Sequence, residues 1–172
     1  MNMPAAKMLV LAGDKFSCIK IIGRANFNSS VDFRTLMNEL RNKGFNYFIL
    51  ELSECALMDS TFLGVLTGFG LRLNPNQAPN HDGAIELRNA NARITDLLEN
   101  LGVLHLFRLT AGPVQEGQAH EAPACRPDKA EMTEACLEAH RTLMNVNPGN
   151  VAKFKDVTQF LAEDLKRMKT PA

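Results

Sequence analysis

The chain has 172 residues, of which 45% are hydrophobic and 22% charged, a composition that indicates a globular protein and excludes a disordered chain. Its 19 basic residues balance its 19 acidic residues, so no net charge would attract nucleic acid or an anionic membrane surface. No apolar run is long enough to cross a bilayer, and residues 1–4 lack the pattern of a secretory signal, so we expect a cytoplasmic protein that does not insert into membranes.

The first 110 residues alternate short apolar runs of strand length with segments whose apolar residues recur at helical spacing. In chain order these predict a strand at 8–12, a strand at 18–22, a helix at 28–43, a strand at 47–52, a helix at 59–73, a strand at 84–87, a helix at 91–101 and a strand at 104–109. The turn-forming residues 13–15 make the first two strands a hairpin, and the run at 47–52 is apolar enough for a central strand buried on both faces. This order predicts an α/β fold.

Polar residues and glycines indicate where the predicted helices begin and end. The helix at 28–43 has Asn28, Ser29 or Ser30 as its N-cap and stops at Gly44. The polar residues 74–82 cannot continue the helix before them and predict a loop.

Beyond residue 110 the composition changes. Residues 111–127 contain three prolines and two glycines without an apolar period, which predicts a linker. Two amphipathic segments follow within residues 128–170 and predict a helical hairpin. Two helices bury too little surface to be stable alone, so they must pack on the domain at 1–110 or on another chain.

The turn Asp59-Ser60-Thr61 is the most informative feature of the sequence. Asp59 suits a helix N-cap, which places Ser60 and Thr61 in the first turn with the Ser60 hydroxyl facing solvent. A phosphate on Ser60 would meet the unpaired amides of the helix N-terminus, and it would change docking more than folding. Taken alone, the tripeptide is better explained as an ordinary helix cap with no further role, because caps of this composition are common.

This turn and the order of elements resemble the STAS domain, the family of bacterial anti-sigma-factor antagonists. The resemblance spans residues 7–110, and the residues that carry it are Met58-Asp59-Ser60-Thr61, Leu63 to Leu66, Leu52-Ser53, Asn89, Leu97-Leu98 and Leu101-Gly102. It implies a mixed β-sheet layered with α-helices. It also implies a transcription regulator that binds a serine kinase acting as anti-sigma factor, is released when Ser60 is phosphorylated, and is reset by a phosphoserine phosphatase. Thr61 is the alternative acceptor.

On this resemblance the protein is a substrate and ligand, not an enzyme, and it needs no cofactor. The expected partner-binding residues are Asp59, Ser60, Thr61, Phe62, Arg24 and Asn26. Phe62 replaces a glycine of many members: exposed, it would be a docking anchor, and buried, it would belong to the core. Many members carry acidic residues in the loop around Arg24, where a charge can also be merely solvated.

The helix at 59–73 carries apolar residues on two faces, of which only one can pack on the sheet. We expect the C-terminal hairpin, or a second copy of the chain in a homodimer, to cover part of the other face and to limit access to Ser60. The competing interpretation is that the hairpin packs elsewhere and only completes the core.

Two other functions remain open. The same fold could serve as a constitutive adaptor, never phosphorylated, in a signalling or transport complex. An enzyme would need a cysteine or metal site, but the four candidate zinc ligands are poorly spaced and suit a packed cysteine and a surface histidine better; they are His120, Cys125, Cys136 and His140. Glu51 and Glu54 suggest solvated charges more than an acid-base pair. All four cysteines are expected to be reduced.

Overall fold

The computed structural model describes residues 6–13, 16–74, 85–113 and 117–169. Within these ranges the strands are β1 (Lys7–Ala12), β2 (Ser17–Ala25), β3 (Phe48–Glu51), β4 (Cys55–Met58), β5 (Ile85–Arg88), β6 (Phe107–Thr110) and β7 (His120–Glu121). The helices are α1 (Phe27–Asn42), α2 (Ser60–Leu73), α3 (Ala92–Asn100), α4 (Lys129–Val146) and α5 (Gly149–Lys169), with a short 3₁₀ helix η1 (Leu104–Leu106). The mixed α/β fold with its C-terminal helical hairpin agrees with the sequence prediction.

The described strands form one mixed sheet in the order β6-β5-β3-β2-β1-β7, and β4 pairs with β2 off this path. β1 and β2 form the predicted antiparallel hairpin, with Leu9 opposite Lys20. β3 runs parallel to β2 on one side and to β5 on the other, and all four of its residues are buried. The prediction of a central strand buried on both faces is therefore confirmed.

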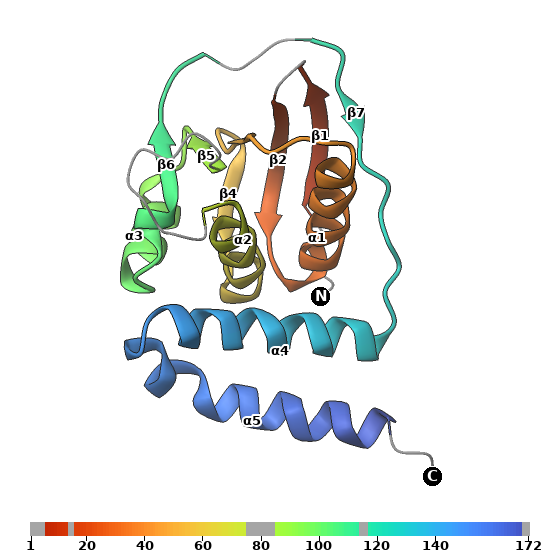
Figure 1. Ribbon diagram of the computed structural model, residues 1–172, viewed down its shortest axis with the longest axis vertical. Helices are drawn as coiled ribbons and strands as arrows, with labels where there is room; N and C mark the ends of the chain where they lie inside the picture. Colours follow the sequence, from red (N-terminus) through yellow and green to blue (C-terminus); the bar gives the residue numbers. More distant parts are fainter. Residues whose placement is uncertain (1–5, 14–15, 75–84, 114–116, 170–172) are drawn as a thin grey trace.

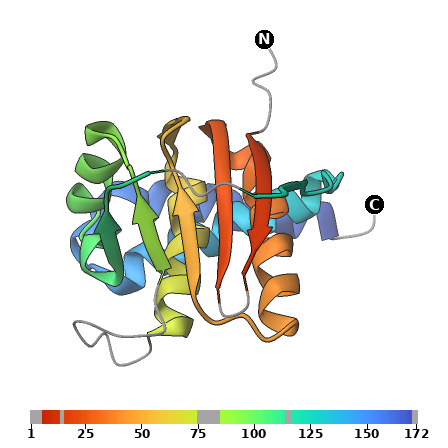
Figure 2. The same cartoon turned by 90° about the horizontal axis from the view of Figure 1, so that it is seen from above.

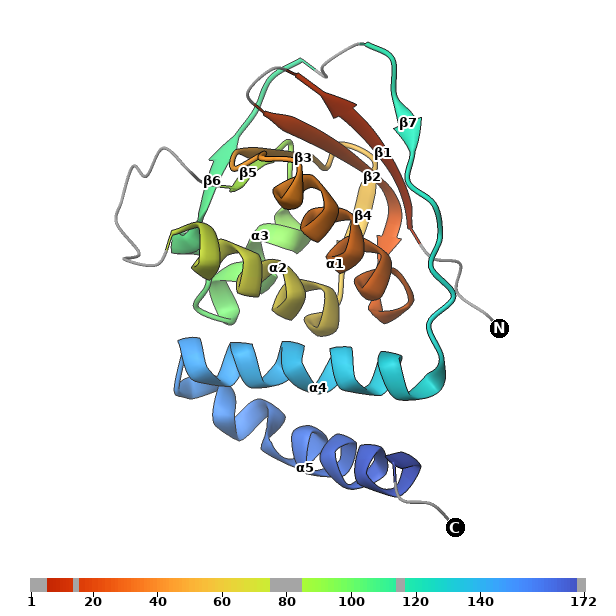
Figure 3. The same ribbon diagram turned by 45° about the vertical axis from the view of Figure 1, so that its right-hand side comes forward.

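The helices stack beyond one face of this sheet. α1 and α2 lie next to the sheet, α4 lies across both of them, and α5 packs on the far side of α4 (Figures 1 and 3). Viewed from above, α4 and α5 lie behind the sheet (Figure 2). α4 therefore has neighbours on two sides, and it covers α2 on the side away from the sheet.

Four details differ from the sequence prediction. The cap of α1 is Asn26, whose side chain accepts from the amide of Asn28 at 3.0 Å, because the chain leaves β2 extended at Asn26 and turns there. The short strand β4 was not predicted. The predicted strand at 104–109 is split, since residues 104–106 form η1 and only 107–110 form β6. The linker contains β7, which pairs with the edge strand β1.

Some predictions concern residues outside the described set: the turn at 14–15, most of the loop at 74–82, and residue 84 of the predicted fourth strand. Among the helices that the structure does describe, none combines the length and the apolar character needed to cross a membrane.

Candidate functional site

Asp59 connects the starts of two helices. Its Oδ1 atom accepts a hydrogen bond from the Phe62 amide at 2.8 Å, and its Oδ2 atom accepts one from the Phe27 amide at 2.7 Å. Burial raises the pKa of the Asp59 carboxyl, and these backbone amides act in the opposite direction. The predicted N-cap of α2 is confirmed, and the same side chain also holds the beginning of α1.

Ser60 is the first residue of α2, and its side chain contacts α4 although the residue is partly exposed. Its Oγ atom lies 2.9 Å from Nε2 of His140, whose Nδ1 atom lies 2.7 Å from the carbonyl oxygen of Cys136. A carbonyl oxygen only accepts, so in the neutral imidazole Nδ1 carries the hydrogen and Nε2 accepts from the Ser60 hydroxyl. The expectation of a solvent-facing hydroxyl therefore holds only in part: Ser60 is partly exposed, but its hydroxyl contacts α4.

Thr61, the alternative acceptor, lies deeper. It is 5% exposed, and its Oγ1 atom is 3.2 Å from Sγ of Cys136. Burial raises the pKa of Cys136, and the contact with Thr61 partly opposes that effect. The thiol is thus held in its less reactive, protonated form.

Phe62 belongs to the core. It is fully buried, and its ring centroid lies 4.7 Å from that of Phe33 in α1. A side chain in this position cannot be the docking anchor that we included among the partner-binding residues. The ring lies within the core cluster that α2 shares with α1.

The two partner-binding residues that were predicted near the end of β2 differ in how far they are exposed. Arg24 is exposed, whereas Asn26 is only 5% exposed and is used as the cap of α1, which removes it from the partner-binding set.

The next residue, Phe27, was missed by sequence reasoning. Its side chain is 50% exposed while its amide binds Asp59. An aromatic residue directly after an asparagine cap was the available signal.

α4 and α2 approach each other most closely at a glycine. A Cβ atom added to Gly64 would lie 2.4 Å from the carbonyl oxygen of Ala139, whereas one added to Gly68 would meet nothing within 4 Å. Only a glycine at position 64 permits this distance. On the other side of α4, the His140 ring packs edge-on against Phe154 of α5 with centroids 4.9 Å apart. The hairpin therefore covers the N-terminal half of α2, as one of the two interpretations expected.

The candidate zinc ligands lie in different surroundings. His140 is 4% exposed, so the expectation of a surface histidine was wrong for this residue. His120 lies in β7, and the Cys125 amide donates to Asp32 at 2.6 Å. Across the part of the chain that the structure describes, no three side chains of the metal-binding types gather as a site for an ion.

Glu51 is not the solvated charge that we expected. It is 1% exposed, and its carboxylate accepts hydrogen bonds from the Ser53 amide at 2.8 Å and from the Asn89 side chain. Glu54 is exposed and pairs with Lys20. The two carboxylates thus have separate structural partners.

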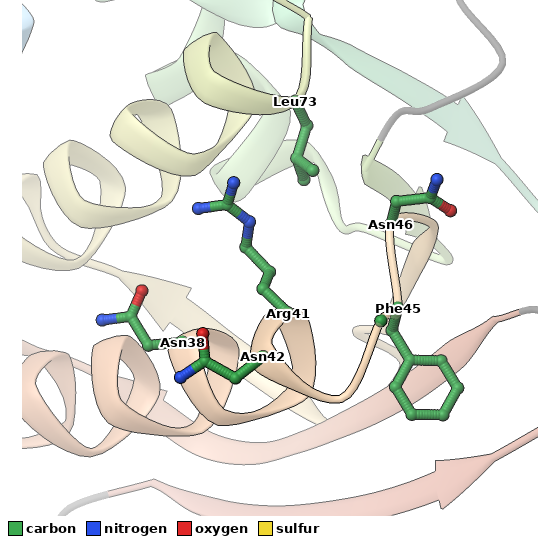
Figure 4. Close-up of a pocket in the computed structure, with 7 residues that line it drawn as sticks. Asn38, Arg41, Asn42, Phe45, Asn46 and Leu73 are labelled. Carbon is green, nitrogen blue, oxygen red and sulfur yellow. The ribbon is translucent and has the colours of Figure 1, made fainter.

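A cleft of about 310 Å³ lies away from Ser60, at the C-terminal ends of α1 and α2. Its lining is rich in side-chain amides, and the Arg41 guanidinium extends from α1 toward α2 (Figure 4). The lining residues are Asn38, Arg41, Asn42, Gly44, Phe45, Asn46 and Leu73. Because this set contains no carboxylate, thiol or imidazole, it offers no acid-base or nucleophilic group.

Comparison with protein-family models gave no match, and neither did comparison with curated protein sequences. Solved structures did match. A candidate anti-sigma factor antagonist from Thermotoga maritima is 20% identical, with 59% of this chain and 83% of that chain covered and a TM-score of 0.51. The anti-sigma factor antagonist SpoIIAA in its unphosphorylated form is 15% identical, with 60% and 87% covered and a TM-score of 0.51.

An anti-sigma factor antagonist from Mycobacterium paratuberculosis is 14% identical, with 64% of this chain and 90% of that chain covered and a TM-score of 0.51. At such identities the likeness concerns the fold, and it leaves more than a third of this chain unmatched. The protein has the STAS fold of these anti-sigma factor antagonists.

Proposed function

We propose that this protein is an anti-sigma-factor antagonist in a bacterial partner-switching pathway, and that it acts in the cytoplasm. It binds a serine kinase that serves as anti-sigma factor, phosphorylation of Ser60 releases it from that kinase, and a phosphoserine phosphatase restores it. The protein itself is a ligand and substrate rather than an enzyme. The fold shared with the anti-sigma factor antagonists supports the general role.

The observation that carries the proposal is the position of the Ser60 hydroxyl. Ser60 begins α2 immediately after the Asp59 cap, and its hydroxyl points away from the sheet toward α4. The neighbouring Thr61 is more deeply buried and Phe62 is core, so Ser60 is the better acceptor of the hydroxyl residues in this turn. Around it, the exposed Arg24 and Phe27 offer a charged and an aromatic contact for a partner.

The test is to purify the protein from its native cells under growth and stress conditions and to map phosphorylation by intact mass and peptide fragmentation. We expect one phosphate, located on Ser60 and absent from the Ser60→Ala variant. The Thr61→Ala variant should retain it. Phosphate on Thr61 instead would contradict the assignment of the acceptor, and an unmodified protein under every condition would contradict the switch.

A second candidate is the constitutive adaptor, which uses the fold as a fixed binding module in a signalling or transport assembly. The contact between Ser60 and His140 favours this candidate, because the hydroxyl already has a partner inside the molecule. A stable complex in native extracts, containing only the unphosphorylated protein and unchanged by Ser60→Ala, would support the adaptor over the switch.

A further inference from the structure

We propose that the α4–α5 hairpin is a displaceable cap over Ser60: a kinase can phosphorylate this residue only after α4 has moved away, and a phosphoryl group on Ser60 then prevents the cap from closing. This inference rests on the proposed function, since it concerns the regulation of the same serine.

The first argument is that α4 occupies the space a kinase would need. Ser60 contacts His140 at 2.9 Å and Thr61 contacts Cys136 at 3.2 Å, so one turn of α4 lies directly on the first turn of α2. Phosphoryl transfer requires the acceptor hydroxyl to lie in line with the γ-phosphate of ATP. Ser60 is partly exposed, but the imidazole lies at hydrogen-bond distance from Oγ, so docked α4 takes up part of the space through which a kinase would bring the γ-phosphate to this hydroxyl.

The second argument is that the product cannot be accommodated under the docked cap. In the transfer, the γ-phosphoryl group of ATP becomes bonded to Ser60 Oγ, and ADP and the hydroxyl proton leave. The group adds about 1.5 to 2 negative charges and three acceptor oxygens beside the Asp59 carboxylate. The His140 ring is held beside this position, because its Nδ1 atom contacts the Cys136 carbonyl and Phe154 packs against the ring, so the added group and the ring compete for the same space.

The third argument is that the cap is incompletely packed. A cleft of about 40 Å³ lies between α2 and α4 beyond Gly64, where Val65, Gly68 and Phe69 of α2 face Ala135 of α4. The contacts nearest Ser60 are polar, namely hydroxyl with imidazole and hydroxyl with thiol. Separation can therefore begin at this polar end of the contact, while Ala139 and Leu143 farther along α4 are buried in the core. The linker before α4 is attached to the sheet through the two-residue strand β7.

Two glycines of α2 provide a matched pair of variants. In Gly64→Ala the new methyl group would lie 2.4 Å from the Ala139 carbonyl oxygen, so α4 has to move away. In Gly68→Ala the methyl group meets nothing within 4 Å. Both substitutions replace a glycine by alanine inside the same helix, so their effects on helix propensity are the same. His140→Ala serves as a further variant, since it removes the ring that covers Ser60 without adding atoms.

The experiment measures two rates on the full-length protein. The first is alkylation of Cys136 by iodoacetamide, followed by peptide mass, because the partly exposed thiol contacts Thr61 while α4 is docked and becomes more accessible when α4 separates. Cys18 and Cys55 are buried in the core and report whether each variant is folded; burial raises the pKa of Cys55 to about 11. The second is phosphorylation of Ser60 in a native-cell extract supplied with ATP.

We expect Gly64→Ala and His140→Ala to increase Cys136 alkylation by about tenfold or more, and Ser60 phosphorylation in parallel, while Gly68→Ala matches the unchanged protein. Phosphorylated protein should be alkylated faster than unphosphorylated protein. The cap is contradicted if Gly64→Ala and Gly68→Ala are phosphorylated at the same rate although Cys136 is alkylated faster in Gly64→Ala. It is also contradicted if phosphorylation of Ser60 slows the alkylation of Cys136. A third outcome is that no variant is phosphorylated although Cys136 still reacts faster in Gly64→Ala than in Gly68→Ala. That outcome would contradict the proposed function and the cap's regulatory role, and it would support only the docking of α4 on α2.

Discussion

Asp59 is the single residue that connects the fold to the candidate site, because its two carboxylate oxygens accept from amides at the starts of α2 and α1. Each of those amides belongs to a helix N-terminus, where backbone donors lack a partner within the helix. The same carboxylate stands beside Ser60. A change at Asp59 therefore affects stability and the surroundings of the proposed acceptor together.

We expect Asp59→Ala to lower the free energy of unfolding by about 1 to 2 kcal/mol, since both amides lose their acceptor. Asp59→Asn should cost less, because its amide oxygen can still accept from Phe62 while its NH₂ group cannot accept from Phe27. Urea unfolding followed by circular dichroism measures both values. Equal losses for the two variants would show that the bond to Phe27 contributes nothing.

At the scale of elements, the α4–α5 hairpin is anchored at its turn as well as over Ser60. Asn150 is fully buried, and its side-chain NH₂ group donates to the carbonyl oxygens of Leu101 at 2.9 Å and of Leu143 at 2.8 Å. These bonds tie the beginning of α5 to the end of α3 and to α4. The turn of the hairpin is thus held by polar contacts that hydrophobic periodicity does not reveal.

We expect Asn150→Ala to destabilise the protein by about 1 kcal/mol, because the carbonyl groups of Leu101 and Leu143 each lose one donor and keep a second one from Asn147. Amide hydrogen exchange should accelerate most in α5. The control is Asn145→Ala, at an exposed position of α4, which should leave both exchange and stability unchanged. Equal exchange rates in the two variants would mean that Asn150 does not anchor the hairpin.

At the scale of the whole molecule, a buried carboxylate links three parts of the sheet. Glu86 in β5 accepts hydrogen bonds from the Tyr47 hydroxyl and from Thr110 in β6, both at 2.6 Å, and from Arg88 at 2.8 Å. Burial acts to raise the pKa of Glu86, but these hydrogen bonds together outweigh it, so the pKa lies below its ordinary value. Ionised Glu86 therefore stabilises the folded sheet.

Because its folded-state pKa lies below the unfolded value, Glu86 contributes stability above the unfolded pKa that is lost as the pH falls through the folded pKa. We expect Glu86→Gln to be less stable than the unchanged protein at about pH 7, and to lose less further stability on acidification to about pH 3. Urea unfolding at the two pH values measures the difference. Parallel losses on acidification would contradict the role of this carboxylate.

The sequence predicts those features of the fold that depend on residues close together along the chain. The period of apolar residues identified the central strand β3 and the helices α1 to α5, and the side-chain chemistry of Asp59 identified the cap of α2. Together with the turn at Ser60, these local patterns were enough to indicate the STAS fold. The cap of α1 was predicted two to four residues too late, at Asn28, Ser29 or Ser30, because Asn26 is chemically similar to these residues and only the path out of β2 distinguishes it.

What only the tertiary structure decided is which surfaces meet. The contact of Ser60 with His140, separated by 80 residues, the burial of Phe62 and the attachment of the linker through β7 all depend on how the elements pack. An amphipathic pattern shows that a helix has an apolar face to bury. It does not show which element covers that face, because the hydrophobic effect is non-directional. The sequence by itself determined most of the elements and the candidate acceptor, whereas the short strands β4 and β7 and the contact of α4 with Ser60 depended on the tertiary structure.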